Sequence, residues 1–327
     1  MDAFFSVNSG LSHDLMMELT VYDENLDGLS AAAFDWLTEG VSRAAIDGEL
    51  SGLRRGLRVS MAGFSRAQDS IPIQRDEGLW GSVSVSPPGT FDVLYNPYVD
   101  EALPWLKSSL VERPESADVK IGKFTRDGEI SNSIIRLSAT FDEELLNYVK
   151  LVYQVDESVL VNSDTARNGH SRLLSTVRWA CGRYSVVFGH FSYAHSGGRT
   201  ELESYLRGPA RVSSRNTPNW RERLRGYSWL TVAPGDIVCH LGGVDALCDS
   251  GAFSSISVLP NGSFLLQATD WFHEYRDERV AAVHRALRAR LIEGEFRRPS
   301  PAPGQPSTHM VLWASGPPGV QLGRRPR

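Results

Sequence analysis

The sequence predicts an α+β protein in which mixed, mainly antiparallel sheets pack against helices. Three kinds of pattern predict this class: stretches in which apolar and polar residues alternate, stretches in which apolar residues recur at helical spacing, and a hairpin signal. The hairpin signal is Asn261-Gly262, which separates SSISVLP from SFLLQAT and favours a tight turn. A chain of 327 residues with 41% hydrophobic content can bury the core that such a fold requires.

The first part of the chain is expected to follow a β-α-β-β-α-β order. A helix is predicted over residues 29–46, where Ser30 can serve as the N-cap and apolar residues share one face. A second helix is predicted over residues 99–111, and Pro104 is expected to kink it or to delay its regular part. The four expected strands cover residues 17–22, 57–64, 80–86 and 119–124.

The second part of the chain carries further patterns of both kinds. Asp142 is placed to cap a helix over residues 143–153, and Gly182 is placed to end a helix over residues 171–181. Thr200 and Glu203 have the spacing of a capping box. The other expected elements are strands over 133–141, 184–193 and 227–232, a short helix over 236–241 and a helix over 275–291.

The stretch LRGYSWLTVAPGDIVCHLGG, residues 224–243, is dense in signals and is interpreted as scaffold. Trp229 is expected to lie in a strand and to point into the core, and Gly242-Gly243 is expected to end the short helix. The residues assigned a structural role are therefore Trp229, Gly226, Gly242, Gly243, Asn261 and Gly262.

Charge and proline content divide the chain into three expected parts. An acidic N-terminal α/β half covers residues 1–126, a related α+β half covers 127–293, and a flexible tail rich in Pro and Arg covers 294–327. Residues 1–118 contain 8 Lys/Arg and 19 Asp/Glu, a net charge of −11, so this half is expected to present a negative field. Within the tail, HMVLWAS is the segment that could dock on the body.

The expected location of the protein is the cytoplasm. The N-terminus has no basic region followed by an apolar stretch, and no run of about 18 apolar residues occurs that could span a membrane. The three cysteines lack CxxC spacing, so they are interpreted as reduced residues and not as a disulfide framework.

No linear catalytic or metal-binding motif is present, and no cofactor is expected. Gly226-Tyr227-Ser228 lacks the second glycine of a nucleophile elbow, and Ser228 falls inside a predicted strand. The sequence contains no P-loop, no HExxH and no GxGxxG after a strand. The candidate metal ligands Cys181, His190, His195, Cys239 and His240 match no zinc spacing. An enzyme whose site has no linear motif stays open as an alternative.

A second alternative is a nucleic-acid-associated protein. Residues 207–225 contain six arginines, one glutamate and Trp220, which a basic loop could use to contact phosphates and to stack a base. The basic C-terminal tail could add to such binding. A solvated or salt-bridged loop is the competing interpretation, because the whole chain has a pI of about 5.9 and no recognised reader fold.

Residues 189–291 resemble bacterial type VI immunity family proteins, which act against polymorphic toxins. The resemblance is carried by GHFS at 189–192, RGYSWLT at 225–231, LGG at 241–243, the strand at 253–259 and LLQA at 265–268. It implies a non-catalytic α+β protein of the cytoplasm that binds and neutralises a cognate toxin domain. It does not imply nucleic-acid or membrane binding.

The partner is expected to be a basic toxin domain, because an acidic surface would speed its association. The candidate contact residues are acids of the N-terminal half: Asp23, Glu24, Asp27, Asp76 and Glu77.

Overall fold

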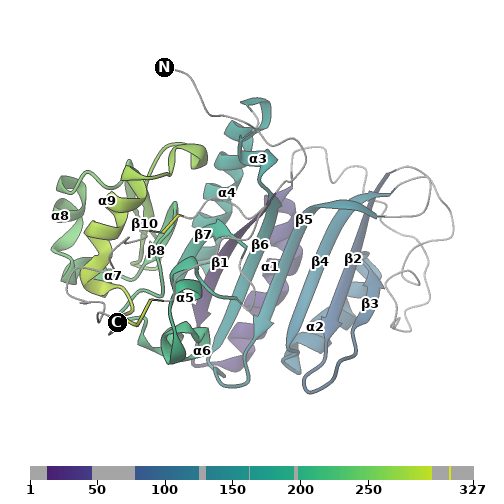
Figure 1. Ribbon diagram of the computed structural model, residues 1–327. Coiled ribbons are helices and arrows are strands. Elements are labelled where there is room, and N and C mark those ends of the chain that lie inside the picture. Colours follow the sequence, from purple (N-terminus) through teal and green to yellow (C-terminus); the bar gives the residue numbers. More distant parts are fainter. Residues whose placement is uncertain are drawn as a thin grey trace, which may run out of the picture.

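The computed structural model describes residues 13–45, 78–124, 130–161, 163–194, 198–296 and 309–310. These residues form an α+β fold, as predicted, built on one ten-stranded sheet (Figure 1). Every strand pair in this sheet is antiparallel, and the strand order is β3-β2-β4-β5-β6-β1-β7-β8-β10-β9. The strands are β1 (Asp14–Tyr22), β2 (Gly78–Ser86), β3 (Leu94–Pro97), β4 (Ser116–Phe124), β5 (Ile130–Phe141), β6 (Tyr148–Asp156), β7 (Val186–Tyr193), β8 (Leu230–Ala233), β9 (Ser255–Val258) and β10 (Phe264–Gln267).

Helices of very different length pack against this sheet or join its strands. The two longest are α1 (Leu26–Ala44) and α4 (Ser163–Arg183). The shorter α-helices are α2 (Leu103–Val111), α3 (Ser158–Val161), α5 (Glu201–Tyr205), α6 (Ser213–Asn216), α7 (Gly235–His240), α8 (Gly243–Asp249) and α9 (Glu278–Leu287). Single 3₁₀ turns are η3 (Asp100–Ala102), η4 (Gly208–Arg211), η5 (Thr217–Asn219), η6 (Phe272–Glu274) and η7 (Arg288–Arg290).

The first strand of the described chain lies in the interior of the sheet. β1 pairs with β6 on one side and with β7 on the other, although both partners come from the second part of the chain. The sheet is therefore continuous across the expected boundary at residues 126 and 127, which itself lies outside the described residues. The division into two halves stays a prediction.

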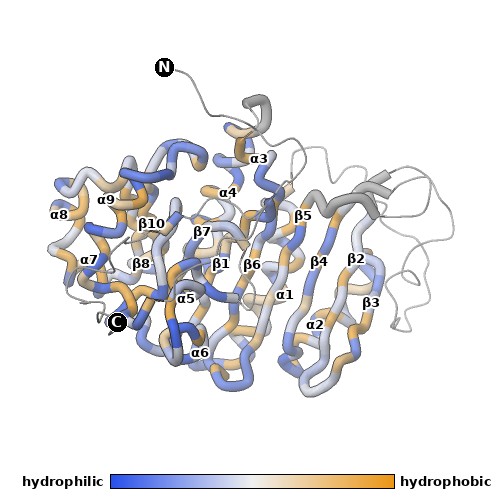
Figure 2. Tube along the Cα trace, viewed as in Figure 1, coloured by the Kyte–Doolittle hydropathy of each residue, from blue (hydrophilic) through white to orange (hydrophobic). Residues whose placement is uncertain are grey.

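One face of the central strands is covered by α1. Leu19 on β1 and Leu151 on β6 are buried apolar residues, and Trp36 of α1 donates a hydrogen bond from Nε1 to the carbonyl of Val152 at 3.2 Å. Hydrophobic and hydrophilic residues are interleaved along these strands (Figure 2), because successive side chains of a strand point to opposite faces. A helix can therefore bury one face while the other face stays polar.

Most of the predicted elements are present in the described residues. The Asn261-Gly262 hairpin joins β9 to β10, and Thr200 and Glu203 form a capping box at the start of α5. Pro104 lies in the first turn of α2, where its missing N–H costs nothing, and η3 precedes it. The order β1-α1-β2-β3-α2-β4 matches the expected pattern, but β3 is a strand that was not predicted, and residues 57–64 lie outside the described chain.

The predicted helix over residues 143–153, with Asp142 as its cap, is wrong, because residues 148–156 form β6. The buried residues of β6 are Val149, Leu151, Tyr153 and Val155, which recur at a period of two. β6 lies between β5 and β1 and pairs with both of them. This pairing on both edges outweighs the helical spacing of apolar residues on which the helix prediction rested.

Three predicted helix ends also differ from the structure. α1 begins at Leu26 with Asn25 as its N-cap, so Ser30 lies inside the helix and does not cap it. α4 continues through Gly182 to Arg183, so Gly182 lies inside the helix and does not end it. The predicted helix over residues 275–291 is shorter as an α-helix, since α9 covers Glu278–Leu287 and the 3₁₀ turn η7 follows.

Part of the C-terminal tail docks on the body. His309 and Met310 are buried, and the backbone N–H of His309 donates to Glu201 Oε1 at 2.9 Å. These two residues begin the segment HMVLWAS, and the other residues after Phe296 lie outside the described chain. Within the residues that the structure describes, no helix is long and apolar enough to cross a membrane.

Candidate functional site

The face of β1 that turns away from α1 carries charge at the centre of the sheet. Glu18 lies opposite His190 of β7, and Thr20 lies opposite Lys150 of β6. Glu18 is fully buried. A carboxylate in this position requires partners, because an unpaired buried charge is very costly.

Arg225 supplies the charge that Glu18 requires. Its Nη1 donates to Glu18 Oε1 at 2.6 Å, its Nε donates to Glu203 Oε1 at 3.0 Å, and its Nη2 donates to Glu203 Oε2 at 3.0 Å. Arg225 is 2% exposed, and both carboxylates are 0% exposed. The arginine therefore ties α5 and the chain before β8 to the central strand. We call Glu18, Glu203 and Arg225 the buried charge cluster.

The charges of this cluster shift its pKa values strongly. Burial alone would raise the pKa of Glu18, but Arg225, Lys150 and His190 outweigh burial and lower that pKa to about 2. Burial would lower the pKa of Arg225, and Glu18 with Glu203 reverses that effect and raises the pKa. Both groups are thus held in their charged forms.

The local chain is shaped to bring Arg225 and Glu203 together. Thr200 accepts a hydrogen bond from the N–H of Glu203 and donates its hydroxyl to the carbonyl of Arg225 at 2.8 Å. Gly226 passes so close to this threonine that a Cβ there would lie 2.8 Å from Thr200 Cβ. Glycine is the residue that fits this approach.

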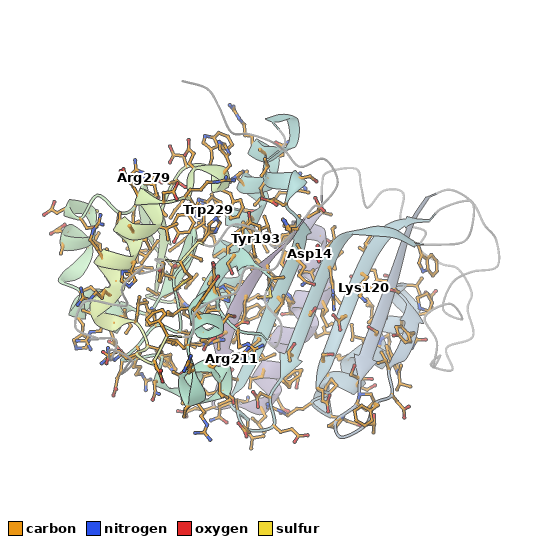
Figure 3. All side chains as sticks on the ribbon, in the orientation of Figure 1. Asp14, Lys120, Tyr193, Arg211, Trp229 and Arg279 are labelled. Carbon is orange, nitrogen blue, oxygen red and sulfur yellow. The ribbon has the colours of Figure 1, made fainter. Side chains whose placement is uncertain are left out.

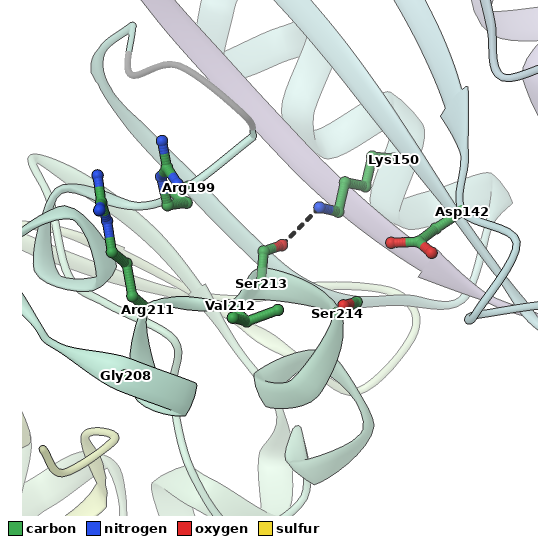
Figure 4. A pocket seen from close by; sticks show the side chains of 8 residues that line it. All are labelled: Asp142, Lys150, Arg199, Gly208, Arg211, Val212, Ser213 and Ser214. Carbon is green, nitrogen blue, oxygen red and sulfur yellow. Dashed lines mark hydrogen bonds between the residues drawn. The ribbon is translucent and has the colours of Figure 1, made fainter.

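A pocket of about 400 Å³ opens beside the buried charge cluster. Figure 4 shows Arg199 and Arg211 on one side of it and Lys150 with Asp142 on the other. Lys150 Nζ donates to Ser213 Oγ at 2.6 Å, and Arg225 Nη2 donates to the same oxygen at 2.8 Å. Ser213 therefore connects the pocket to the buried charge cluster. We call this feature the basic pocket; Gly208, Val212 and Ser214 complete its lining.

A second candidate site lies where two loops meet at the end of β1 and the start of β6. The N–H of Asp23 donates to the carbonyl of Asn147 at 3.1 Å and joins the loops. The Tyr22 ring lies 5.1 Å from the ring of Tyr148 and 6.2 Å from that of Trp220. Three aromatic side chains from distant parts of the sequence therefore meet at this end of the sheet.

Exposed acidic and apolar side chains lie in the chain segments next to Tyr22 and Tyr148. Leu26 is 40% exposed and Leu146 is 56% exposed, which is unusual for large apolar residues. Arg221 packs over Trp220 at 4.4 Å and adds one positive charge. We call the whole feature the loop surface; its exposed acids are Glu24, Asp27, Glu143 and Glu144.

The predicted contact residues differ in their exposure to solvent. Glu24 and Asp27 are exposed on the loop surface, whereas Asp23 is partly buried and accepts a hydrogen bond from the N–H of Asn25 at 2.9 Å. Asp76 and Glu77 lie outside the described residues. Sequence reasoning missed Glu143 and Glu144 because it took contact acids only from the acidic N-terminal half. It also missed the basic pocket, whose lining residues are spread over the second part of the chain.

The predicted scaffold residues occupy structural positions, but two details differ from the prediction: Trp229 immediately precedes β8 and does not lie in it, and Gly243 begins α8 after α7 has ended at His240. Trp229 is 0% exposed and donates from Nε1 to the carbonyl of Thr269 at 2.8 Å. Trp229 and Tyr193, labelled in Figure 3, both pack edge-on against the ring of Phe272. Positive φ angles of 96° at Gly242, 83° at Gly243 and 82° at Gly262 suit glycine, and Asn261 donates from Nδ2 to the carbonyl of Val186.

The candidate nucleophile and metal ligands serve other purposes where the structure describes them. Ser228 Oγ is buried and accepts a hydrogen bond from the N–H of Phe191 at 3.0 Å. Cys181 is buried in the core, whereas Cys239 is exposed. Among the described residues, no group of three or more His, Cys, Asp or Glu side chains is placed to hold a metal ion.

The fold and these two sites define an α+β protein with an acidic loop surface and a basic pocket. No family model matches the chain, and no curated protein matches it. Among solved structures, the chain is similar to "Pseudomonas aeruginosa T6SS protein PA0821" at 12% sequence identity and a TM-score of 0.47. The match covers 89% of this chain and 78% of the other. A likeness at this level assigns no function.

Proposed function

We propose that this protein is a non-catalytic immunity protein that binds and neutralises a basic bacterial toxin domain through the loop surface. One observation carries the proposal: two loops and a third segment distant in sequence bring three aromatic rings together at one end of the sheet, and the segments next to Tyr22 and Tyr148 also carry exposed leucines and acids. The resemblance of residues 189–291 to type VI immunity proteins supports the class of partner.

The composition of the loop surface suits protein recognition. Aromatic residues are enriched at the centres of protein interfaces, and polar residues form the rim. Tyr22, Tyr148 and Trp220 provide large rigid rings, and Leu26 and Leu146 are exposed apolar side chains in the neighbouring segments. Because tryptophan and tyrosine dominate binding hot spots, we expect these rings to contribute most of the affinity.

The four exposed acids favour a partner of opposite charge. Glu24, Asp27, Glu143 and Glu144 outnumber the single exposed cation, Arg221. A field of this sign attracts a basic surface and raises the association rate, and salt weakens the attraction. The loop surface is therefore expected to set both the partner's charge and the speed of binding.

Several arginines that would contact nucleic acid in the alternative function have partners within the protein. Arg225 is buried in the charge cluster, Arg223 bonds Glu293 Oε1 at 3.0 Å, and Arg207 bonds Glu295 Oε1 at 3.3 Å. These three arginines of the 207–225 segment are paired within the protein. The paired arrangement agrees with the salt-bridged interpretation of that segment.

Co-expression with the product of the neighbouring gene, which the proposal predicts to be a toxin, tests the proposal. The unaltered protein should preserve cell growth and should co-purify with the toxin domain. A protein that co-purifies with no toxin domain and gives no protection would contradict the proposal, as would catalytic turnover of a substrate that accounts for the protection.

Charge reversal locates the contact. Changing Glu24, Asp27, Glu143 and Glu144 to Lys should slow association by about tenfold or more at low salt, because steering is reversed. The matched control changes Asp245 and Asp249 to Lys on α8, whose exposed acids lie away from the loop surface (Figure 1). An equal loss of on-rate in both variants, measured by surface plasmon resonance, would place the contact elsewhere.

A further inference from the structure

We propose that the basic pocket binds a small phosphorylated molecule, which it holds by the phosphate group. The pocket lining contains none of the acids and rings proposed to contact a toxin, so this inference goes beyond the proposed function. It rests on the identity of the lining side chains, on the charge they carry and on the fixed floor beneath them.

The lining charges match a phosphate. Lys150, Arg199 and Arg211 are three cations, and Asp142 is one carboxylate, so the lining has a net charge of +2. A phosphate monoester carries nearly two negative charges at neutral pH. Arginine forks bind phosphate oxygens in pairs, and a lysine adds a point charge, which together favour phosphate over a single carboxylate.

The floor of the pocket is rigid before any ligand arrives. Ser213 Oγ accepts hydrogen bonds from both Lys150 and Arg225, and Arg225 is itself held by two buried carboxylates. Among the described residues, Ser213 is the hydrogen-bond partner of the Lys150 ammonium, which has three donors in all. A positioned ammonium group loses little entropy on binding, so the pocket is preorganised for an anion.

The volume indicates more than a free phosphate ion. A pocket of about 400 Å³ falls within the range of small-molecule sites, which is roughly 300–1,000 Å³. Asp142 and the hydroxyl of Ser214 lie on the same lining and can bind hydroxyl or amine groups of the ligand. The ligand class is therefore a phosphate monoester of a small polar molecule, such as a sugar phosphate or a nucleoside monophosphate.

The surroundings of the pocket disfavour a long polyanion. Ser214 also donates to Glu144 Oε2 at 2.9 Å, so an acid of the loop surface lies at the pocket's edge. The backbone of a nucleic acid that entered the pocket would have to continue past Asp142 and Glu144, which would repel its phosphates. A compact ligand avoids this repulsion.

Isothermal titration calorimetry of the full chain tests the inference with five probes: inorganic phosphate, ribose 5-phosphate, adenosine monophosphate, citrate and a single-stranded RNA. We expect the two monoesters to bind at about 1 mM or tighter and to bind better than inorganic phosphate or citrate. RNA should not compete with them. No binding by either monoester, or tighter binding of RNA or citrate, would overturn the assignment.

Matched variants place the binding in the pocket. Arg199→Gln and Arg211→Gln should each weaken monoester binding about 10- to 100-fold, as expected for a lost charged hydrogen bond. Arg215→Gln is the control, because Arg215 is exposed on α6 and does not line the pocket. Equal affinities in all three variants would overturn the proposal, and unchanged melting temperatures would show that each variant is folded. Toxin protection is scored separately, so either proposal can fail alone.

Discussion

The two faces of β1 differ in the way they join the strand to the rest of the protein. On one face Leu15, Leu19 and Val21 pack into an apolar layer, where stability comes from removing carbon surface from water. On the other face Glu18 meets Arg225, and stability depends on exact pairing of charges. The apolar face tolerates substitutes of similar size, whereas the charged face fixes which segment covers the sheet.

Of the changes that test this comparison, the removal of Arg225 should cause the largest loss of stability. Arg225→Met leaves Glu18 and Glu203 buried without their shared cation, so we expect a loss of about 3–5 kcal/mol in the free energy of unfolding. Urea denaturation measures the loss, and Arg215→Met is the exposed control. Adding Glu18→Gln to Arg225→Met should restore part of the stability, because it removes one unpaired charge. A loss below about 1 kcal/mol for Arg225→Met would show that the charges do not hold this face together.

Truncation on the apolar face should cost somewhat less. Leu19→Ala removes buried methyl groups from the layer beneath α1, and we expect a loss of about 2–5 kcal/mol. Leu19→Met conserves most of the volume and should cost under about 1.5 kcal/mol. If both variants lost the same stability, volume would not be the quantity that this face requires.

Lowering the pH should destabilise the charged face gradually, and the loss of stability should be smaller than in the Arg225→Met and Leu19→Ala variants. The pKa of Glu18 is about 2 in the folded protein against 4.5 as a reference, so its contribution is complete above pH 4.5 and is lost as pH falls toward 2. The expected change is on the order of 2–3 kcal/mol over that range. Melting temperatures measured from pH 6 to about pH 2 should fall less steeply in Glu18→Gln than in the unaltered protein. Identical slopes would show that Glu18 does not titrate with a lowered pKa.

Sequence patterns predicted an element correctly where the residues that determine it lie close together in the chain. The Asn261-Gly262 turn, the Thr200 to Glu203 capping box and the amphipathic helix α1 each depend on neighbours within a few residues. The same reasoning failed over residues 143–153, because the pattern EELLNYVKLVY satisfies helical spacing and β6 is selected by its two partner strands.

The sequence by itself determined the α+β class, the hairpin, the Thr200 to Glu203 capping box and the burial of Trp229, because each follows from local preference and apolar spacing. Only the tertiary structure decided that Glu18 meets Arg225 and that Lys150 lies beside Ser213. Glu18 and Arg225 are separated by more than 200 residues, and strand register sets the position of one while a glycine-permitted close approach sets the other. No short window of sequence contains both constraints, so the buried charge cluster and the basic pocket follow from the folded sheet alone.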